Sequence, residues 1–263
     1  MLRGSITIGQ YLPIESSIHR LDPRTKIIAV LAYVIVLFLI SAYTGYLVMA
    51  GLTAIIAVLG KIPLRMLARG LRPILFIIVL TVMLNAVMTP GELLYRIGPL
   101  SITEEGLLQA GFMASRLLLL IMTTSMLTLT TAPIDLTDGI EYLLGPFKRI
   151  GVPAHELAMM MTIALRFIPT LLDEAERIMK AQMARGADFE TGSFIQRAKN
   201  MIPLLVPLFI SAFRRADDLA LAMEARCYRG GEGRSRFKVL HMEKLDAAAA
   251  LTLALGFSAA LMV

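Results

Sequence analysis

The chain has 263 residues, of which 57% are apolar, and its mean hydropathy is +0.71. This composition excludes an ordinary soluble domain and is typical of a polytopic membrane protein. The net charge of +6 does not indicate nucleic acid, because the basic residues fall in loops between apolar segments, where they set membrane topology. One cysteine excludes an internal disulfide, and three scattered histidines show no metal-binding spacing.

Five apolar segments can be followed in chain order as candidate membrane spans. The uncharged stretch between Lys26 and Lys61 is broken by SAYTG at 41–45, so it predicts two short helices in a tight hairpin. A third span lies within 73–91, a fourth within 107–131, and a fifth within 247–263. We therefore expect about five transmembrane helices.

The region before the last span is charged. Residues 135–246 hold 16 of the 26 Lys and Arg and 15 of the 20 Asp and Glu. Its apolar runs, Leu157–Leu165 and Met201–Phe213, are too short to cross a bilayer. Pro203 and Pro207 lack a backbone donor, so the helix should bend or begin there. We expect this region to lie in water beside the membrane.

Orientation follows from the Lys and Arg counts of the short loops. The N-terminal segment and the second loop are basic, whereas the first loop has no charge and the third is mostly acidic. The sequence thus predicts an all-α integral membrane protein in four parts. These are a cytoplasmic N-terminal segment (1–26), transmembrane helices 1–4 (27–131), a cytoplasmic domain (132–245), and a fifth transmembrane helix (246–263) that leaves the C-terminus outside.

Two amphipathic helices in the charged region end alike, in AQMARG at Gly186 and in AMEARC at Cys227. Their arginines, Arg185 and Arg226, lie 41 positions apart. The apolar face expected for the second helix comprises Ala212, Phe213, Ala216, Leu219, Ala220 and Met223. Gly186 suits a left-handed helix stop, whereas Cys227 does not, so Gly230 and the following glycine are expected to provide the second turn. Basic helix ends also compensate the helix dipole. The repeated ending favours a second interpretation, in which two like endings bind two like receptors.

Several chemistries are missing from the sequence. No G-x-x-x-x-G-K-[ST] loop, H-E-x-x-H pair or G-x-S-x-G elbow occurs, and no carboxylate lies deep in a span. We therefore expect no catalytic residue, no cofactor, no metal site and no reaction of the chain's own.

At these residues the sequence resembles the transmembrane T component of energy-coupling factor (ECF) transporters, the EcfT family, which is related to the cobalt- and nickel-type CbiQ subunits. HRLDPRTK (19–26) resembles the opening signature of that family, and Asp22 before Pro23 is expected to cap the first span. The segments 164–186 and 202–231 resemble its two coupling helices. The resemblance covers nearly the whole chain.

The resemblance implies a function and partners. Family members sit in the prokaryotic plasma membrane, bind two ABC-type ATPases on the cytoplasmic side, and hold a small substrate-binding membrane subunit, the S component. Motion driven by ATP passes through the coupling helices to that subunit, which delivers a vitamin or another micronutrient. The ATPase-binding motifs carried over to this chain are Ala184-Arg185-Gly186 and Ala225-Arg226-Cys227, where the family's common pattern has glycine in place of Cys227.

Alternatives remain open at this point. The chain could be a secondary transporter with its own substrate path, a membrane anchor for a cytoplasmic assembly, or a T component dedicated to cobalt or nickel. Arg116, inside the fourth span, either contacts the bundle or the S component, or extends towards the outer interface. Soft methionine side chains suit a surface that accepts several partners. The candidate S-component surface comprises Met159, Met160, Met161, Met179 and Met183.

Overall fold

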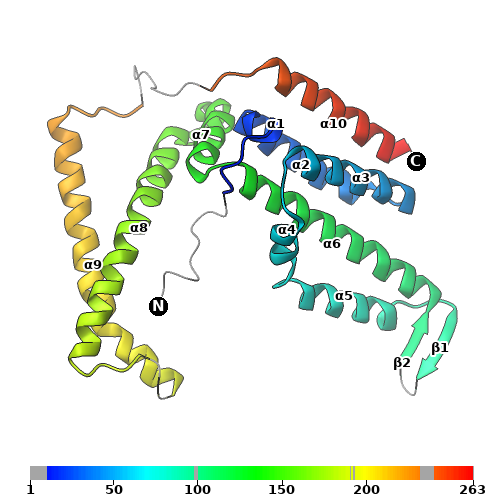
Figure 1. Ribbon diagram of the computed structural model, residues 1–263, viewed down its shortest axis with the longest axis horizontal. Helices are drawn as coiled ribbons and strands as arrows, with labels where there is room; N and C mark the ends of the chain where they lie inside the picture. The colour runs from blue at the N-terminus through cyan, green and yellow to red at the C-terminus, as the bar shows by residue number, and fades with distance from the viewer. Residues whose placement is uncertain (1–10, 98–99, 190, 192, 232–239, 263) are drawn as a thin grey trace. The chain divides into compact units, whose positions relative to one another are not determined.

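The computed structural model describes residues 11–97, 100–189, 191, 193–231 and 240–262. The chain divides into two compact units (Figure 1). We call residues 8–140 together with 238–263 the apolar unit, and residues 141–237 the hairpin unit.

The apolar unit is built almost entirely of helices. In chain order its elements are α1 (Ser17–Arg20), α2 (Pro23–Leu39), α3 (Tyr43–Leu59), α4 (Leu64–Leu71), α5 (Leu75–Met88), β1 (Leu93–Ile97), β2 (Leu100–Thr103), α6 (Glu104–Thr130) and α10 (Lys244–Met262). Helix α7 (Pro133–Leu144) runs across the boundary into the hairpin unit. The predicted all-α membrane class is confirmed, with one addition. The two strands pair antiparallel, with Leu93 opposite Thr103, in what the sequence indicated only as a loop.

Each of the five predicted spans is helical, in α2, α3, α5, α6 and α10. Among the described residues, three helices are long and apolar enough to cross a membrane, namely α6, α10 and α8 (Ala154–Ala184). Helices α4 and α5 form a pair bent by 60° that can make a fourth span. Helix α3 is apolar but shorter, with 17 residues. The count of five crossings therefore stays a prediction. Helix α8 differs from expectation, because it continues as one helix far beyond the short apolar run at 157–165.

The core of the apolar unit lies between α2, α3, α6 and α10. Tyr33 and Leu37 of α2 are buried with Met49 of α3 and Leu119 of α6. The Tyr33 hydroxyl donates to the Met49 carbonyl at 3.2 Å, which satisfies a polar group that would otherwise be costly to bury. Gly45 of α3 allows α10 to approach closely, since a Cβ on Gly45 would meet the Ala260 carbonyl oxygen of α10 at 2.7 Å.

The HRLDPRTK segment forms a group of polar contacts at the start of α2. The Asp22 side chain caps the helix by accepting from the Arg24 amide at 2.9 Å, and Pro23 follows at the first helical position. The Asp22 amide donates to the Asp246 carboxylate of α10 at 2.8 Å. Lys26 donates to the Thr130 carbonyl of α6 at 3.0 Å. The segment thus ties three helices together, which goes beyond the cap expected from the sequence.

Arg116 of α6 contacts its own helix bundle. Its Nε donates to the Tyr46 hydroxyl of α3 at 3.1 Å, and its guanidinium lies 5.0 Å from the ring centroid of Phe38 in α2. A cation over an aromatic face is favourable, and more so away from water. Of the two readings of Arg116, the structure supports the contact inside the bundle.

The hairpin unit contains a 3₁₀ turn at Gly145–Ile150 and the two long helices α8 and α9 (Phe194–Ala225). Helix α9 begins before Pro203 and continues through it and Pro207, so the expectation that a helix might begin at either proline is wrong. Very little of the two helices is buried. Only Ala154 and Ala158 of α8 and Leu204 of α9 are buried among the described residues. Two such exposed helices suit a surface that partners cover.

Candidate partner-binding site

Helices α8 and α9 are held together by a polar contact. Arg215 of α9 forms an ion pair with Glu174 of α8 at 2.8 Å, and the Ser211 hydroxyl donates to the same carboxylate at 2.6 Å. The hydrogen bond from Ser211 and the charge of Arg215 lower the pKa of Glu174. The carboxylate therefore stays ionised, and the contact stays intact, throughout the neutral pH range.

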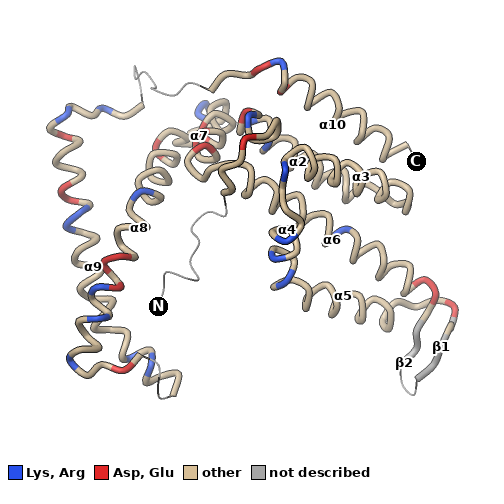
Figure 2. Tube along the Cα trace, viewed as in Figure 1, with Lys and Arg blue, Asp and Glu red and all other residues tan. Residues whose placement is uncertain are grey.

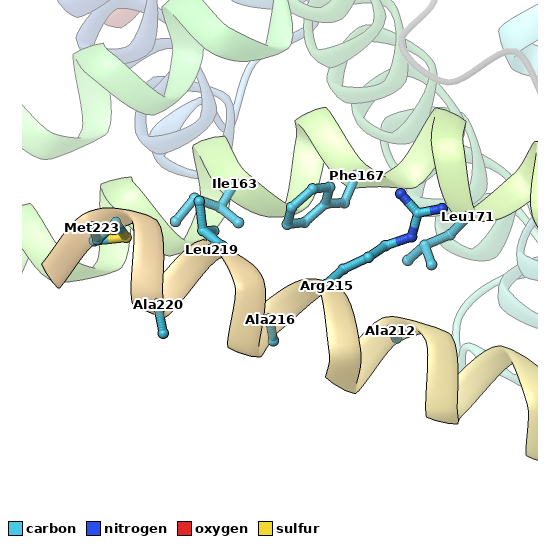
Figure 3. Close-up of a pocket in the computed structure, with 9 residues that line it drawn as sticks. All are labelled: Ile163, Phe167, Leu171, Ala212, Arg215, Ala216, Leu219, Ala220 and Met223. Atoms are coloured by element: carbon cyan, nitrogen blue, oxygen red, sulfur yellow. The ribbon is translucent and has the colours of Figure 1, made fainter. Parts of the chain in front are cut away.

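An apolar groove of about 250 Å³ runs beside this contact (Figure 3). Its lining comes from both helices, namely Ile163, Phe167, Leu171, Ala212, Arg215, Ala216, Leu219, Ala220 and Met223. The α9 members largely match the apolar face expected from the sequence. Phe213, expected on that face, is absent from the lining and is 68% exposed.

The two helices run antiparallel. The Gln182 side chain, near the end of α8, lies 3.5 Å from the Pro203 carbonyl of α9. The Tyr228 hydroxyl, just beyond the end of α9, lies 3.2 Å from His155 at the start of α8. The helix ends that carry the two arginines therefore lie at opposite ends of the pair (Figure 1). From Pro203 to Arg226 the helix rises about 35 Å, too far for both ends to enter one pocket.

Arg185 is the C-cap of α8, and the turn that follows it is a Schellman motif. The Gly186 amide donates to the Met183 carbonyl and the Ala187 amide donates to the Gln182 carbonyl, both at 3.0 Å. Gly186 has φ +88°, in the left-handed region that glycine adopts at no steric cost.

The end of α9 repeats this motif residue for residue. The Cys227 amide donates to the Glu224 carbonyl at 2.8 Å, and the Tyr228 amide donates to the Met223 carbonyl at 3.0 Å. Cys227 itself adopts φ +53°. The expectation that Gly230 and its neighbour provide this turn is therefore wrong, because the left-handed turn closes at Cys227.

Both arginines are free to bind a partner. Arg185 and Arg226 are exposed, as are Ala184 and Ala225 before them. Within the described residues neither arginine makes an ion pair or a side-chain hydrogen bond. A guanidinium presented in this way can form a bidentate contact with a carboxylate.

The second arginine end has an anchor that the first lacks. His155 is bonded on one side to Tyr228, at 3.2 Å, and on the other to Glu141 of α7, at 2.9 Å. A Cβ on Gly231 would meet the His155 ring at 2.5 Å, so a side chain there would displace the ring. Ala187 stands at the position equivalent to Tyr228 and has no side chain that could make such a bond.

An exposed apolar stripe on α9 was not identified from the sequence as a binding surface. Six side chains at helical spacing are each 40–68% exposed, and they are Ile202, Leu205, Val206, Phe209, Ile210 and Phe213. The short run broken by two prolines suggested only a buried or interfacial helix. The signal was the spacing i, i+3, i+4, i+7, i+8, i+11 on one continuous helix.

The methionines proposed for an S-component surface are not gathered into one patch. Met160, Met161 and Met183 are 42–55% exposed, whereas Met159 and Met179 are partly buried. Positions 161 and 183 are separated by about 33 Å of helix. Their role stays a prediction.

Known proteins similar to this chain share one family. The CbiQ family model, described as a cobalt transport protein, matches residues 15–239. A protein from Thermosediminibacter oceani, named energy-coupling factor transporter transmembrane protein EcfT, is 63% identical over 93% of this chain and 92% of its own length. Proteins of the same name from Acidaminococcus fermentans and Bacillus subtilis are 57% and 48% identical, over 94% and 91% of this chain and 92% and 91% of their own lengths.

These relatives align over nearly their whole length, and the apolar helices described above suit a multi-pass membrane protein. The chain belongs to the EcfT family, whose members are the transmembrane components of energy-coupling factor transporters.

Proposed function

We propose that this chain is a non-catalytic coupling subunit, which transmits ATP-driven motion from two ATPases to a substrate-binding S component. The observation that carries the proposal is the pair of helix ends with the same capping hydrogen bonds. Arg185 and Arg226 sit at the same position of the same Schellman motif, at opposite ends of one antiparallel helix pair. Two similar ends far apart suit two homologous receptors better than one.

The ATPases dock at the motifs Ala184-Arg185-Gly186 and Ala225-Arg226-Cys227. Each arginine projects from a helix end with no acidic partner in the described part of the chain. Acidic grooves on the ATPases would satisfy both guanidinium groups. ATPase activity resides in those partner chains.

The S component contacts the apolar stripe of α9. Six exposed apolar side chains in line exceed what a monomeric helix leaves in water, and a membrane-embedded partner would cover them. In this arrangement the hairpin of α8 and α9 contacts ATPases at its ends and the S component along its side. The ion pair between Glu174 and Arg215 holds the two helices together, so that motion at the ends is transmitted along the pair.

The domain assignment and topology belong to the same proposal. The N-terminal segment and residues 132–245 lie in the cytoplasm of a prokaryotic cell, and the C-terminus lies outside. The transported substrate is a vitamin or another micronutrient chosen by the S component. A secondary transporter would instead need a titratable or ion-binding group in its spans. Helices α3 and α5 contain no charged residue, and Arg116 of α6 is bonded to Tyr46 within the bundle.

Affinity purification of the full chain in mild detergent, followed by identification of the associated chains, tests this function. Two ABC-type ATPases and a small membrane protein should copurify with it. The purified chain without ATPases should neither bind nor hydrolyse ATP. The secondary transporter would be favoured if the chain purified alone from cells that also express such ATPases and an S component, and if the isolated chain took up substrate.

A further inference from the structure

A basic stripe lies on the short helix α4 of the apolar unit. Arg65, Arg69 and Arg72 follow one another at i, i+4 and i+7, so these three point to one side of α4, and Lys61 lies in the turn that precedes the helix. All four are exposed. Figure 2 shows basic residues on α4, next to α5, which carries no charge. No acidic residue occurs in the sequence from 23 to 91.

These cations have no partner in the part of the chain that the structure describes. None of the four takes part in an ion pair or a side-chain hydrogen bond there. The three arginines on one side of α4 repel each other unless an anion lies close by. The stripe is therefore complementary to a surface of negative charge.

The rotation of α4 about its axis is fixed by its apolar side. Leu67 is 2% exposed and belongs to a buried cluster with Ala57, Ile62, Met126 and Leu129. This anchor holds α4 on α6, and the axis of α4 is bent by 60° from that of α5.

A second apolar side chain of α4 is left uncovered. Leu64 is 75% exposed, and on the helix it lies between the buried position of Leu67 and the basic stripe. Helix α4 thus has three sides, one packed on the protein, one apolar and exposed, and one cationic.

This arrangement is that of an interfacial helix. An amphipathic helix with a basic face places its apolar side among lipid chains and its cations among the headgroups. Since α4 joins two apolar helices, its ends are already at the edge of the bilayer. We propose that α4 is a binding site for anionic phospholipids, in which Leu64 enters the lipid chains and the arginines bind the headgroup phosphates. This site is independent of the arginine ends of α8 and α9.

The absence of tryptophan from the chain makes a direct experiment possible, because Leu64→Trp introduces the only tryptophan. The full-length variant is placed in lipid nanodiscs that contain phosphatidylcholine and phosphatidylglycerol. Bromine quenchers are carried by the acyl chains of one lipid or the other. Each cation near a headgroup favours an anionic lipid about fivefold. We expect brominated phosphatidylglycerol to reach half-maximal quenching at a lower mole fraction than brominated phosphatidylcholine. The difference should be about fivefold or more.

Two variants in the Leu64→Trp background separate charge from folding. Arg65→Gln with Arg69→Gln and Arg72→Gln should make the two lipids quench equally. The corresponding triple lysine variant keeps the charge and should keep the preference. A matched control is Leu84→Trp, on α5, where the side chain is 44% exposed and no basic residue is near in sequence. Both lipids should quench that tryptophan equally.

Equal quenching of Leu64→Trp by the two lipids would overturn the proposal. So would a preference that survives in the triple glutamine variant, or one that is equally strong at Leu84→Trp. None of these outcomes depends on ATPases or an S component, because the measurement uses the chain alone. If the coupling function were disproved, the lipid-site proposal would still stand. If the lipid site were disproved, the coupling function would still stand.

Discussion

The ends of α8 and α9 have the same backbone hydrogen-bond pattern but differ in the contacts that stabilise it. Both place an arginine at the C-cap and close with the same two hydrogen bonds. The first end closes at Gly186, whereas the second closes at Cys227 in a conformation that costs a side-chain-bearing residue about 1–2 kcal/mol. The second end also has the bond from Tyr228 to His155. The same arginine geometry is thus reached by conformational freedom at one end and by tertiary contact at the other.

Because the two ends reach the same arginine position in different ways, we infer that this position is the feature that matters at both ends. A cation that merely compensates the helix dipole needs neither a defined turn nor a matched partner, and lysine would replace it fully. Each helix end therefore serves as a control for variants of the other.

The largest effect is expected when both arginines are removed. Arg185→Ala with Arg226→Ala should abolish ATPase assembly, because two linked contacts reinforce each other through effective concentration. The membrane fold should persist, since both side chains are exposed. Pull-down of the ATPases measures assembly, and a thermal unfolding curve of the purified chain provides the control. Assembly at the wild-type level would mean that the repeated ending has no part in docking.

Each single alanine variant should have a smaller but still large effect. Truncating an interface arginine costs about 2–4 kcal/mol, which is roughly 30- to 1,000-fold in affinity. Arg185→Ala and Arg226→Ala should weaken assembly to a similar extent. Lysine at either position should restore only part of the lost ATPase affinity, because it cannot form a bidentate contact. Binding titrations with purified ATPases measure both. Full recovery with lysine would favour the dipole explanation.

Removing the anchor should affect one end only. Tyr228→Phe deletes the hydroxyl that reaches His155 and leaves the helix end otherwise intact. One lost hydrogen bond is worth about 0.5–1.5 kcal/mol, so ATPase affinity should fall about two- to tenfold. The loss should disappear in the Arg226→Ala background and persist beside Arg185→Ala. Equal losses in the two backgrounds would contradict a local role for the anchor.

The smallest effect is expected at the residue that closes each turn. Cys227→Gly should leave assembly intact and change the free energy of unfolding by no more than about 1 kcal/mol, since relief of strain is partly offset by the greater freedom of glycine in the unfolded chain. Gly186→Ala should destabilise by about 1 kcal/mol through φ alone, because no atom lies within 4 Å of the added Cβ. Denaturant unfolding in detergent compares the two. A destabilising Cys227→Gly would show that the thiol makes a contact of its own.

Much of the apolar unit could be predicted from the sequence, because a membrane helix reveals itself by length and hydropathy alone. The cap by Asp22 before Pro23 was also a local pattern. The contacts of Asp22 with Asp246 could not be predicted, since they join residues 224 positions apart.

The candidate site was predicted in part. The paired arginines are visible in the sequence, but their positions at opposite ends of an antiparallel pair depend on tertiary contacts. The left-handed turn at Cys227 was missed, because backbone preference argues against it and the hydrogen bonds of the motif override that preference. The apolar stripe of α9 was missed, because two prolines suggested a break where the helix continues.

The most direct test of two arginine ends for two receptors is site-specific photocrosslinking in the assembled transporter. Ala181 and Ala222 are exposed, each lies four residues before its arginine, and they are related by the same spacing of 41 residues. A photoreactive residue at Ala181 should capture one ATPase, and the same residue at Ala222 should capture the other. Capture of a single ATPase at one shared site from both positions, or of none from either, would contradict the account.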